Sequence, residues 1–310
     1  MKTIKGILFS SLFIAFIFLT GCYNFGSDQD SDKLQVVATT TMLTDLLKEI
    51  GGEQIDVTGL MSAGVDPHLY KASARDVIYM QSADVVAYNG LGLEGKMGEI
   101  FQGLEEQKKT VISLEDGLNE EDILSAGEGS TSIDPHIWFD VDLWKKSAIE
   151  VSKGLISADP KNETSYQANL ESYLLELEEL DQYVANRVNE LPEDDRVLVT
   201  AHDAFSYFGE GYGFNVIGLQ GLNTNAEAGT GDISQLADYI VDNGIKAIFI
   251  ESSVPTRTIE SLQAATKAKG FEVEIGGELY SDSLGDKEND SETYIKTVKS
   301  NVDTIVDALK

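Results

Sequence analysis

Histidine is rare in this chain, and two of the three histidines stand in the same local sequence. His68 and His136 each follow an Asp-Pro dipeptide. The proline fixes its own φ and holds the preceding aspartate in an extended conformation, so both rings are presented from stiff turns. Imidazole nitrogen is a common ligand of divalent transition metals. The repeated presentation therefore favours two rings that point at one metal ion.

The third histidine, His202, follows the apolar run at residues 197–200. This run predicts a buried strand, and ligand sites of open α/β sheets form at the carboxyl ends of strands. Any one of the three histidines could equally be a hydrogen-bonded structural residue. A structural role for each is less favoured because all three lie at corresponding loop positions. We therefore interpret the three histidines as one metal-binding set.

A site of this kind usually contains a carboxylate as well. Acidic residues are abundant, so the choice among them depends on position in the chain. Asp282 follows the last predicted strand of the second half, at the same edge as His202. Glu278 and Asp286 are the alternatives that position alone leaves open.

A metal-dependent hydrolase is the alternative of another class, because three histidines and a carboxylate also hold catalytic zinc. The sequence has no H-E-x-x-H, G-x-S-x-G or G-x-x-x-x-G-K-[ST] motif. Asp203 or Glu251 could act as a general base, but hydrogen bonding to a ligand histidine explains either residue equally well. We therefore expect a binding protein and no enzyme.

Short apolar runs alternate with helical patterns in two halves of the chain. In the first half, strands are predicted at residues 34–38, 55–60, 84–88 and 110–114, with helices at 42–50, 74–81 and 96–107. In the second half, strands are predicted at 197–200, 216–219, 247–251 and 271–275, with helices at 234–243, 258–269 and 294–309. Such alternation builds parallel sheets covered by helices. The expected fold is α/β, with two (β/α) lobes.

One long amphipathic stretch separates the two halves. Apolar residues recur every three or four positions from 162 to 191, with Pro160 near the start and Pro192 just past the end. These 30 residues would make about 45 Å of helix. A coiled-coil arm is the alternative, but sustained heptads are not evident. We predict a rigid backbone helix at 161–192 that joins an N-terminal lobe at 34–160 to a C-terminal lobe at 193–310.

The N-terminus has the pattern of a bacterial lipoprotein signal. Lys2 and Lys5 precede an apolar run at residues 7–19, which is too short to span a bilayer roughly 30 Å thick. Small residues then precede Cys22, the only cysteine of the chain. We predict a signal peptide at 1–21, lipidation of Cys22 and a polar tether at 22–33. With no other cysteine, the chain can form no disulfide and offer no thiolate site.

The composition is strongly acidic, with a formal net charge of −30. Removal of the two lysines of the signal peptide leaves 21 basic against 53 acidic residues, or −32. Nucleic-acid binding needs a basic footprint, so the charge argues against it.

Four ordered motifs give the chain a specific resemblance. They are Gly-Val-Asp-Pro-His at 64–68, Asp-Pro-His-Ile-Trp-Phe-Asp at 134–140, Thr-Ala-His-Asp-Ala-Phe at 200–205 and Gly-Glu-Leu-Tyr-Ser-Asp at 277–282. Together they resemble the zinc/manganese cluster of ABC-transporter solute-binding lipoproteins, most of all its manganese-binding members from Gram-positive bacteria. The resemblance covers essentially the whole mature chain.

The resemblance implies metal ligands His68, His136, His202 and Asp282, two from each lobe. It implies a monomer, lipid-anchored on the extracytoplasmic face of the cell membrane, that delivers its metal to an ABC permease driven by a cytoplasmic ATPase. Some surface lipoproteins of this family have been called adhesins, but nothing in the sequence supports that role.

Manganese is the expected metal, with zinc as the alternative. Many manganese-binding relatives have a glutamate where this chain has His202, which makes the site closer to zinc binders. Zinc-specialised relatives, however, often carry a histidine-rich loop before the second ligand. The stretch at residues 114–133 contains acids, glycine and serine but no histidine.

Overall fold

The computed structural model describes residues 32–125 and 132–310. The predicted signal peptide, Cys22 and nearly all of the predicted tether lie outside the described residues. Residues 33–310 form one compact unit, and the lobe boundaries expected within it stay a prediction. None of the described helices is both long and apolar enough to cross a membrane.

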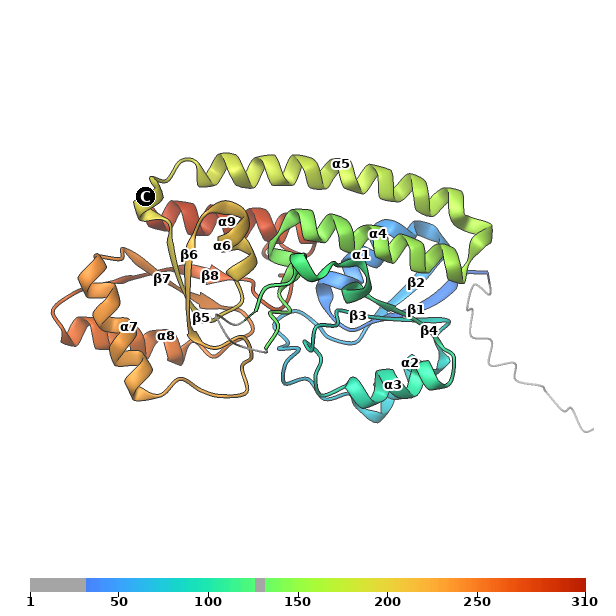
Figure 1. Cartoon of the computed structure of the whole chain (residues 1–310), viewed down its shortest axis with the longest axis horizontal. Helices are drawn as coiled ribbons and strands as arrows, with labels where there is room; N and C mark the ends of the chain where they lie inside the picture. Colours follow the sequence, from blue (N-terminus) through green and yellow to red (C-terminus); the bar gives the residue numbers. More distant parts are fainter. Residues whose placement is uncertain (1–31, 126–131) are drawn as a thin grey trace, which may run out of the picture. The chain divides into compact units, whose positions relative to one another are not determined.

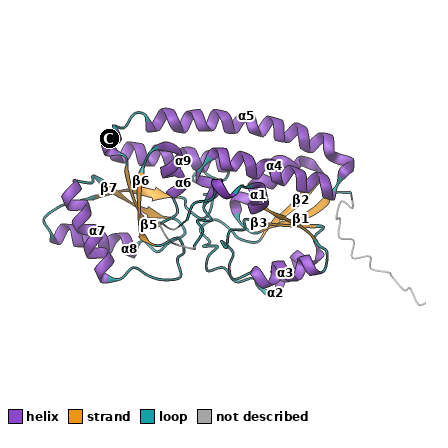
Figure 2. Cartoon of the chain, in the orientation of Figure 1, coloured by secondary structure: helices purple, strands orange, loops and turns teal. Residues whose placement is uncertain are grey.

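A four-stranded parallel sheet, in the order β2-β1-β3-β4, lies in the N-terminal half of the unit. Figure 1 labels its four strands, and Figure 2 shows helices around it. Its strands are β1 (Leu34–Ala38), β2 (Ile55–Gly59), β3 (Val85–Tyr88) and β4 (Thr110–Ser113). The helices between them are α1 (Thr41–Gly51), α2 (Ala74–Ser82) and α3 (Gly98–Glu106). Successive strand residues face opposite sides. Val36 therefore packs in the cluster that contains α1, whereas Val37 packs with residues of α2 and α3.

The C-terminal half also contains parallel strands. Strand β5 (Val197–His202) pairs with β6 (Asn215–Gln220), and β7 (Ala247–Glu251) pairs with β8 (Glu274–Leu279). Strands β5 and β7 lie beside each other. The helices are α6 (Ser206–Tyr212), α7 (Thr230–Asn243), α8 (Arg257–Ala268) and α9 (Tyr294–Leu309). The α/β class expected from the sequence is confirmed.

The helix between the halves is α5 (Glu163–Val188), whose 26 residues make about 39 Å of helix. It packs against α1 and α4 (Val141–Ala158) of one half and α9 of the other, as Figure 1 shows. Asn169 donates to the carbonyl of Ile50, and Tyr183 donates to Asp303 on α9. Helix α5 is shorter at both ends than the predicted 161–192. A 3₁₀ turn at Pro160–Asn162 precedes it, and a turn in which Glu190 and Leu191 donate to the carbonyls of Arg187 and Val188 ends it.

Six 3₁₀ turns complete the described elements. They are η1 (Gly52–Gln54), η2 (Leu114–Gly117), η3 (Glu120–Asp122), η4 (Ile137–Phe139), η5 (Pro160–Asn162) and η6 (Glu193–Asp195). The turn η4 directly follows His136.

Three elements differ in kind or position from the sequence-based expectation. One is the short helix α6 (Ser206–Tyr212), which was not predicted. Helix α4 (Val141–Ala158) was not predicted; Asp140 caps it and Trp144 lies on its buried face. The last strand was predicted at 271–275 but runs from Glu274 to Leu279, through two glycines. A Cβ on Gly276 would lie 2.7 Å from Phe249 Cε1 and from Ala308 Cβ. These glycines let β8 lie close to β7 and α9, whereas their sequence predicts a turn.

Candidate metal centre

All four side chains expected to bind metal lie together. One donor atom from each of His68, His136, His202 and Asp282 lies within 4.8 Å of the others. Their exposed fractions are 5%, 0%, 0% and 1%, respectively. The cluster draws one residue each from the loop after β2, the loop before α4, the end of β5 and the loop after β8.

The three Nε2 atoms surround the Asp282 carboxylate. His202 Nε2 lies 3.3 Å and His68 Nε2 3.7 Å from Oδ2, and His136 Nε2 lies 3.5 Å from Oδ1. His68 Nε2 and His136 Nε2 are 3.2 Å apart. Among the described residues, His202 Nε2 and both Asp282 oxygens have no hydrogen-bond partner. Buried polar atoms are normally paired, and one cation at the centre would satisfy all of these atoms at once.

The two Asp-Pro-His segments form the stiff turns that the sequence predicts. The N–H of His68 donates to Asp66 Oδ1 at 2.8 Å, and the N–H of His136 donates to Asp134 Oδ1 at 3.0 Å. Asp134 Oδ1 also lies 2.7 Å from His136 Nδ1. When the Nδ1–H of His136 donates a hydrogen bond to Asp134, the lone pair of Nε2 is available to bind a metal.

His202 is the last residue of β5, not the loop residue that the sequence predicts. Glu251, the last residue of β7, accepts from the N–H of His202 at 2.9 Å and contacts Nδ1 at 2.6 Å. Glu251 therefore orients the ring of His202, as in one of the two roles considered for it from the sequence. Asp203 instead accepts from the Ser206 hydroxyl at 2.8 Å. Its pKa is raised, mainly by burial.

Asp282 is held by the residues on either side of it. Trp138 Nε1 donates to the Ser281 carbonyl at 2.9 Å, and Gly64 N donates to the Ser283 hydroxyl at 2.8 Å. Glu278 and Asp286, the alternatives to Asp282 from the sequence, lie outside the cluster. Glu278 is exposed on β8, and exposed Asp286 accepts from Asn289.

Burial and charge set the protonation of the cluster. Burial lowers the pKa of His68 to about 4, so this ring is neutral at neutral pH. Burial alone would raise the pKa of Asp282, but the three imidazoles, His202 first, hold it below its ordinary value. Burial would lower the pKa of His202, yet Glu251 and then Asp282 raise it well above the usual range.

Three contacts around the cluster were not expected from the sequence. Trp138 anchors the Asp282 loop, Tyr207 donates to the Asp134 carbonyl at 2.9 Å, and Thr224 donates to Asp66. Each joins residues more than 70 positions apart. No local pattern signals such pairs; only the Trp138 motif of the family resemblance could have pointed to one of them.

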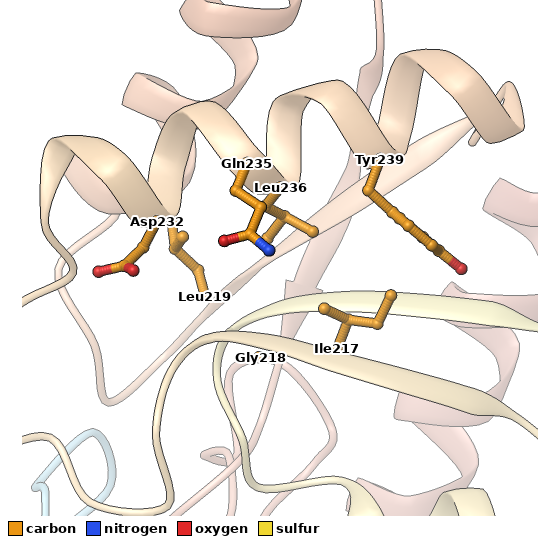
Figure 3. Close-up of a pocket in the computed structure, with 7 residues that line it drawn as sticks. All are labelled: Ile217, Gly218, Leu219, Asp232, Gln235, Leu236 and Tyr239. Atoms are coloured by element: carbon orange, nitrogen blue, oxygen red, sulfur yellow. The ribbon is translucent and has the colours of Figure 1, made fainter.

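A second concave feature lies away from the cluster, in a groove of about 310 Å³ between β6 and α7 (Figure 3). Its lining residues are Ile217, Gly218, Leu219, Asp232, Gln235, Leu236 and Tyr239. With one carboxylate and no imidazole, this groove does not offer a set of metal ligands.

The chain is similar to known metal-binding proteins over most of its length. The family model described as "Zinc-uptake complex component A periplasmic" (ZnuA) matches residues 36–308. The chain is 43% identical over 307 residues to the manganese-binding lipoprotein MntA of Bacillus subtilis (strain 168), covering 99% of each chain. It is 31% identical over 303 residues to the iron ABC transporter substrate-binding lipoprotein MtsA of Streptococcus pyogenes serotype M1, covering 96% of each.

The zinc-binding protein TroA of Treponema pallidum (strain Nichols) is similar in both sequence and structure. It is 44% identical over 294 residues, covering 94% of each chain. The solved structure of the periplasmic zinc-binding protein TroA from Treponema pallidum has a TM-score of 0.86, covering 89% of this chain and 99% of that chain. The names of these relatives therefore include three different metals.

Proposed function

Because the chain belongs to the periplasmic zinc-uptake component A family, we propose that it captures one divalent transition metal outside the cytoplasm and delivers it to an ABC importer. The observation that carries this proposal is the buried cluster of His68, His136, His202 and Asp282, whose facing donor atoms lack other partners among the described residues. Several relatives are named as substrate-binding lipoproteins of metal ABC transporters.

The mechanism is binding without chemistry. The metal enters the cluster as cargo, and ligands from the parts of the chain before and after α5 exclude water from it. A membrane permease recognises the loaded form and accepts the ion, while a cytoplasmic ATPase supplies the energy. The protein acts as a monomer, attached to the membrane through lipidated Cys22.

Binding is favoured over hydrolysis by the burial of the cluster. A catalytic zinc site keeps one position open for water or substrate. Here four donor residues surround the centre and none is more than 5% exposed. A metal-dependent turnover of ester or phosphate substrates by the purified protein, lost in His202→Ala, would overturn this choice.

Manganese is the proposed cargo, with zinc as the alternative. Both Asp282 oxygens lie within 3.7 Å of an imidazole Nε2 and face the cluster. A bidentate carboxylate would give five donor atoms, which manganese accepts, whereas a monodentate one would give the tetrahedral arrangement of zinc. Zinc should still bind tightly in vitro, because the Irving–Williams order places it above manganese.

The deciding experiment is growth of a gene-deletion strain in metal-depleted medium with one metal restored at a time. We expect the deletion to raise the requirement for added Mn²⁺, and complementation by the intact gene to restore growth at low Mn²⁺. Complementation with His136→Ala is the matched control and should fail. A deletion strain deficient for Zn²⁺ but normal for Mn²⁺ would reverse the metal assignment and keep the transport function.

A further inference from the structure

The two Asp-Pro-His turns are alike in the backbone but differ in what the aspartate does next. In both turns, Oδ1 of the aspartate accepts from the N–H of the histidine. Asp134 also holds the ring of His136 through Nδ1 at 2.7 Å. No described residue forms such a hydrogen bond with Nδ1 of His68. Among the described residues, the His68 ring is therefore held by its turn, by its contacts at Nε2 and by packing against the rings of His136 and His202.

The second oxygen of Asp66 is held from the other half of the chain. The Thr224 hydroxyl donates to Asp66 Oδ2, across 158 residues of sequence. Thr224 lies in the loop at residues 221–229, between β6 and α7. Most of this loop is exposed, but Leu222 is buried and Thr224 and Ala228 are partly buried.

The bond can exist only while the two halves are together. Asp66 belongs to the loop after β2, and Thr224 to the loop after β6. If these halves separate, the hydrogen bond breaks and Asp66 loses the group that fixes the rotation of its carboxylate. Asp66 is also the acceptor for the His68 N–H. Rotation of the Asp66 carboxylate therefore loosens the turn that presents His68.

We propose that Thr224 is a positioning residue for His68, acting through Asp66, and that it makes retention of His68 on the metal depend on closure of the two halves. This inference rests on the proposed metal-binding function and assigns a regulatory contact to the same site. Of the three histidines, His68 is the one released first when the metal leaves, because His136 and His202 each keep a carboxylate on Nδ1.

The test uses the full mature protein with Thr224→Val, which keeps the shape of the side chain and removes the hydroxyl. Loss of a hydrogen bond that orients a metal ligand costs about 10–100-fold in affinity. We expect Mn²⁺ and Zn²⁺ to bind about tenfold more weakly, through faster dissociation. Thr224→Ser should restore wild-type binding. Thr230→Val is the matched control, since Thr230 is exposed at the start of α7.

Dissociation is measured by mixing loaded protein with excess EDTA and following tryptophan fluorescence. The Trp138 ring lies 5.3 Å from the ring of His136, so its emission should report the metal. The melting temperature of the metal-free protein should be the same for Thr224→Val and wild type. A purely structural role of Thr224 would lower that melting temperature and leave the dissociation rate unchanged.

A double-mutant cycle tests the route through Asp66. In the Asp66→Ala background, Thr224→Val should add no further loss of affinity, since the two residues act as one unit. An unchanged dissociation rate in Thr224→Val, or an equal loss with and without Asp66, would overturn the inference. Failure of the wild type to bind either metal would overturn the proposed function itself, and the inference with it.

Discussion

At the scale of single residues, carboxylates orient two of the three histidines proposed to bind metal. Asp134 contacts Nδ1 of His136 at 2.7 Å, and Glu251 contacts Nδ1 of His202 at 2.6 Å. A carboxylate on one ring nitrogen sets the tautomer and makes the other nitrogen a better metal donor. Both carboxylates are buried, so the rings keep their orientation without a metal.

Each proposed ligand should be needed for binding. Replacing His68, His136, His202 or Asp282 by Ala, one at a time, should weaken Mn²⁺ binding by at least about tenfold, or about 1.4 kcal/mol. The metal-free fold should survive, because within the described residues these donor atoms contact only one another. Titration calorimetry measures the affinity, and Asp286→Ala is the control, since Asp286 is exposed. A strong effect of Asp286 with none of Asp282 would contradict the assignment.

Metal binding should release a proton. Glu251 and Asp282 raise the pKa of His202 well above its usual range against the opposing effect of burial. The metal-free ring is therefore protonated at neutral pH, and a metal must displace that proton. Below the raised pKa, affinity should increase about tenfold for each unit of pH. Competition titrations at pH 6.5 and 7.5 measure the slope.

The matched variant for this pH dependence is Glu251→Gln. It removes the largest electrostatic contribution that raises the pKa of His202, so the dependence of affinity on pH should become weaker. An affinity for Mn²⁺ that is the same at both pH values in the wild type would rule out displacement of the proton.

At the scale of elements, side chains of α1 accept hydrogen bonds from two backbone N–H groups of the C-terminal half. Leu284 N donates to Thr41 Oγ1, and Tyr294 N donates to Asp45 Oδ2, each at 2.8 Å. Tyr294 is the first residue of α9, so Asp45 accepts an N–H that the helix itself leaves unpaired. Helix α1 thereby links α9 and the loop that carries Asp282.

Asp45 should make stability depend on pH. Burial is the main cause that raises its pKa from 3.8 to about 6, with Glu49 and Glu292 adding and Tyr294 and Lys48 opposing. The folded state therefore holds the proton more tightly than the unfolded state. The stabilisation is complete below pH 3.8 and is lost as the pH rises through about 6. At neutral pH the charged carboxylate destabilises the fold by at most about 3 kcal/mol.

The variant Asp45→Asn keeps an acceptor for the Tyr294 N–H and removes the charge. We expect urea unfolding of the metal-free protein at pH 7.5 to show a gain of about 1–2 kcal/mol. The gain should shrink as the pH falls from 6 to 4. Asp56→Asn is the control, because the Asp56 side chain is half-exposed and its ion pair with Lys33, at 3.8 Å, lies at the surface. A variant less stable than wild type at pH 7.5 would contradict the argument.

At the scale of the whole molecule, the metal should stabilise the fold, because its proposed ligands come from both halves of the chain. Binding to the native state alone adds about 2.7 kcal/mol at a hundredfold excess over Kd. The melting temperature of chelated protein should rise with Mn²⁺ or Zn²⁺ and change little with Mg²⁺. Calorimetry with His136→Ala as control measures this, and equal shifts in both proteins would show binding elsewhere.

The membrane anchor is tested on the intact chain in a bacterial host. Cys22→Ala should abolish acylation, so the protein should leave the membrane fraction and appear in the medium. Metabolic labelling with a palmitate analogue and cell fractionation measure the two effects. Continued acylation of the variant would contradict the predicted lipoprotein signal.

The sequence by itself determined the local chemistry and most of the elements. Short stretches of sequence are enough to recognise the three histidines, the two Asp-Pro turns and the strand–helix alternation. Proline restricts its neighbour, and apolar periodicity follows from burial of one face. For this reason the first strand and the last helix were found at residues 34–38 and 294–309, as the structure has them.

Only the tertiary structure decided which distant groups meet. It places Asp282, and neither Glu278 nor Asp286, among the three imidazoles, and it brings Glu251 to His202 and Thr224 to Asp66. It also turns the glycine pair before Glu278 into strand, because β7 and α9 leave no room for side chains there. The Glu251–His202 and Thr224–Asp66 contacts join residues 49 and 158 positions apart. Packing of whole elements sets such contacts, and local sequence does not.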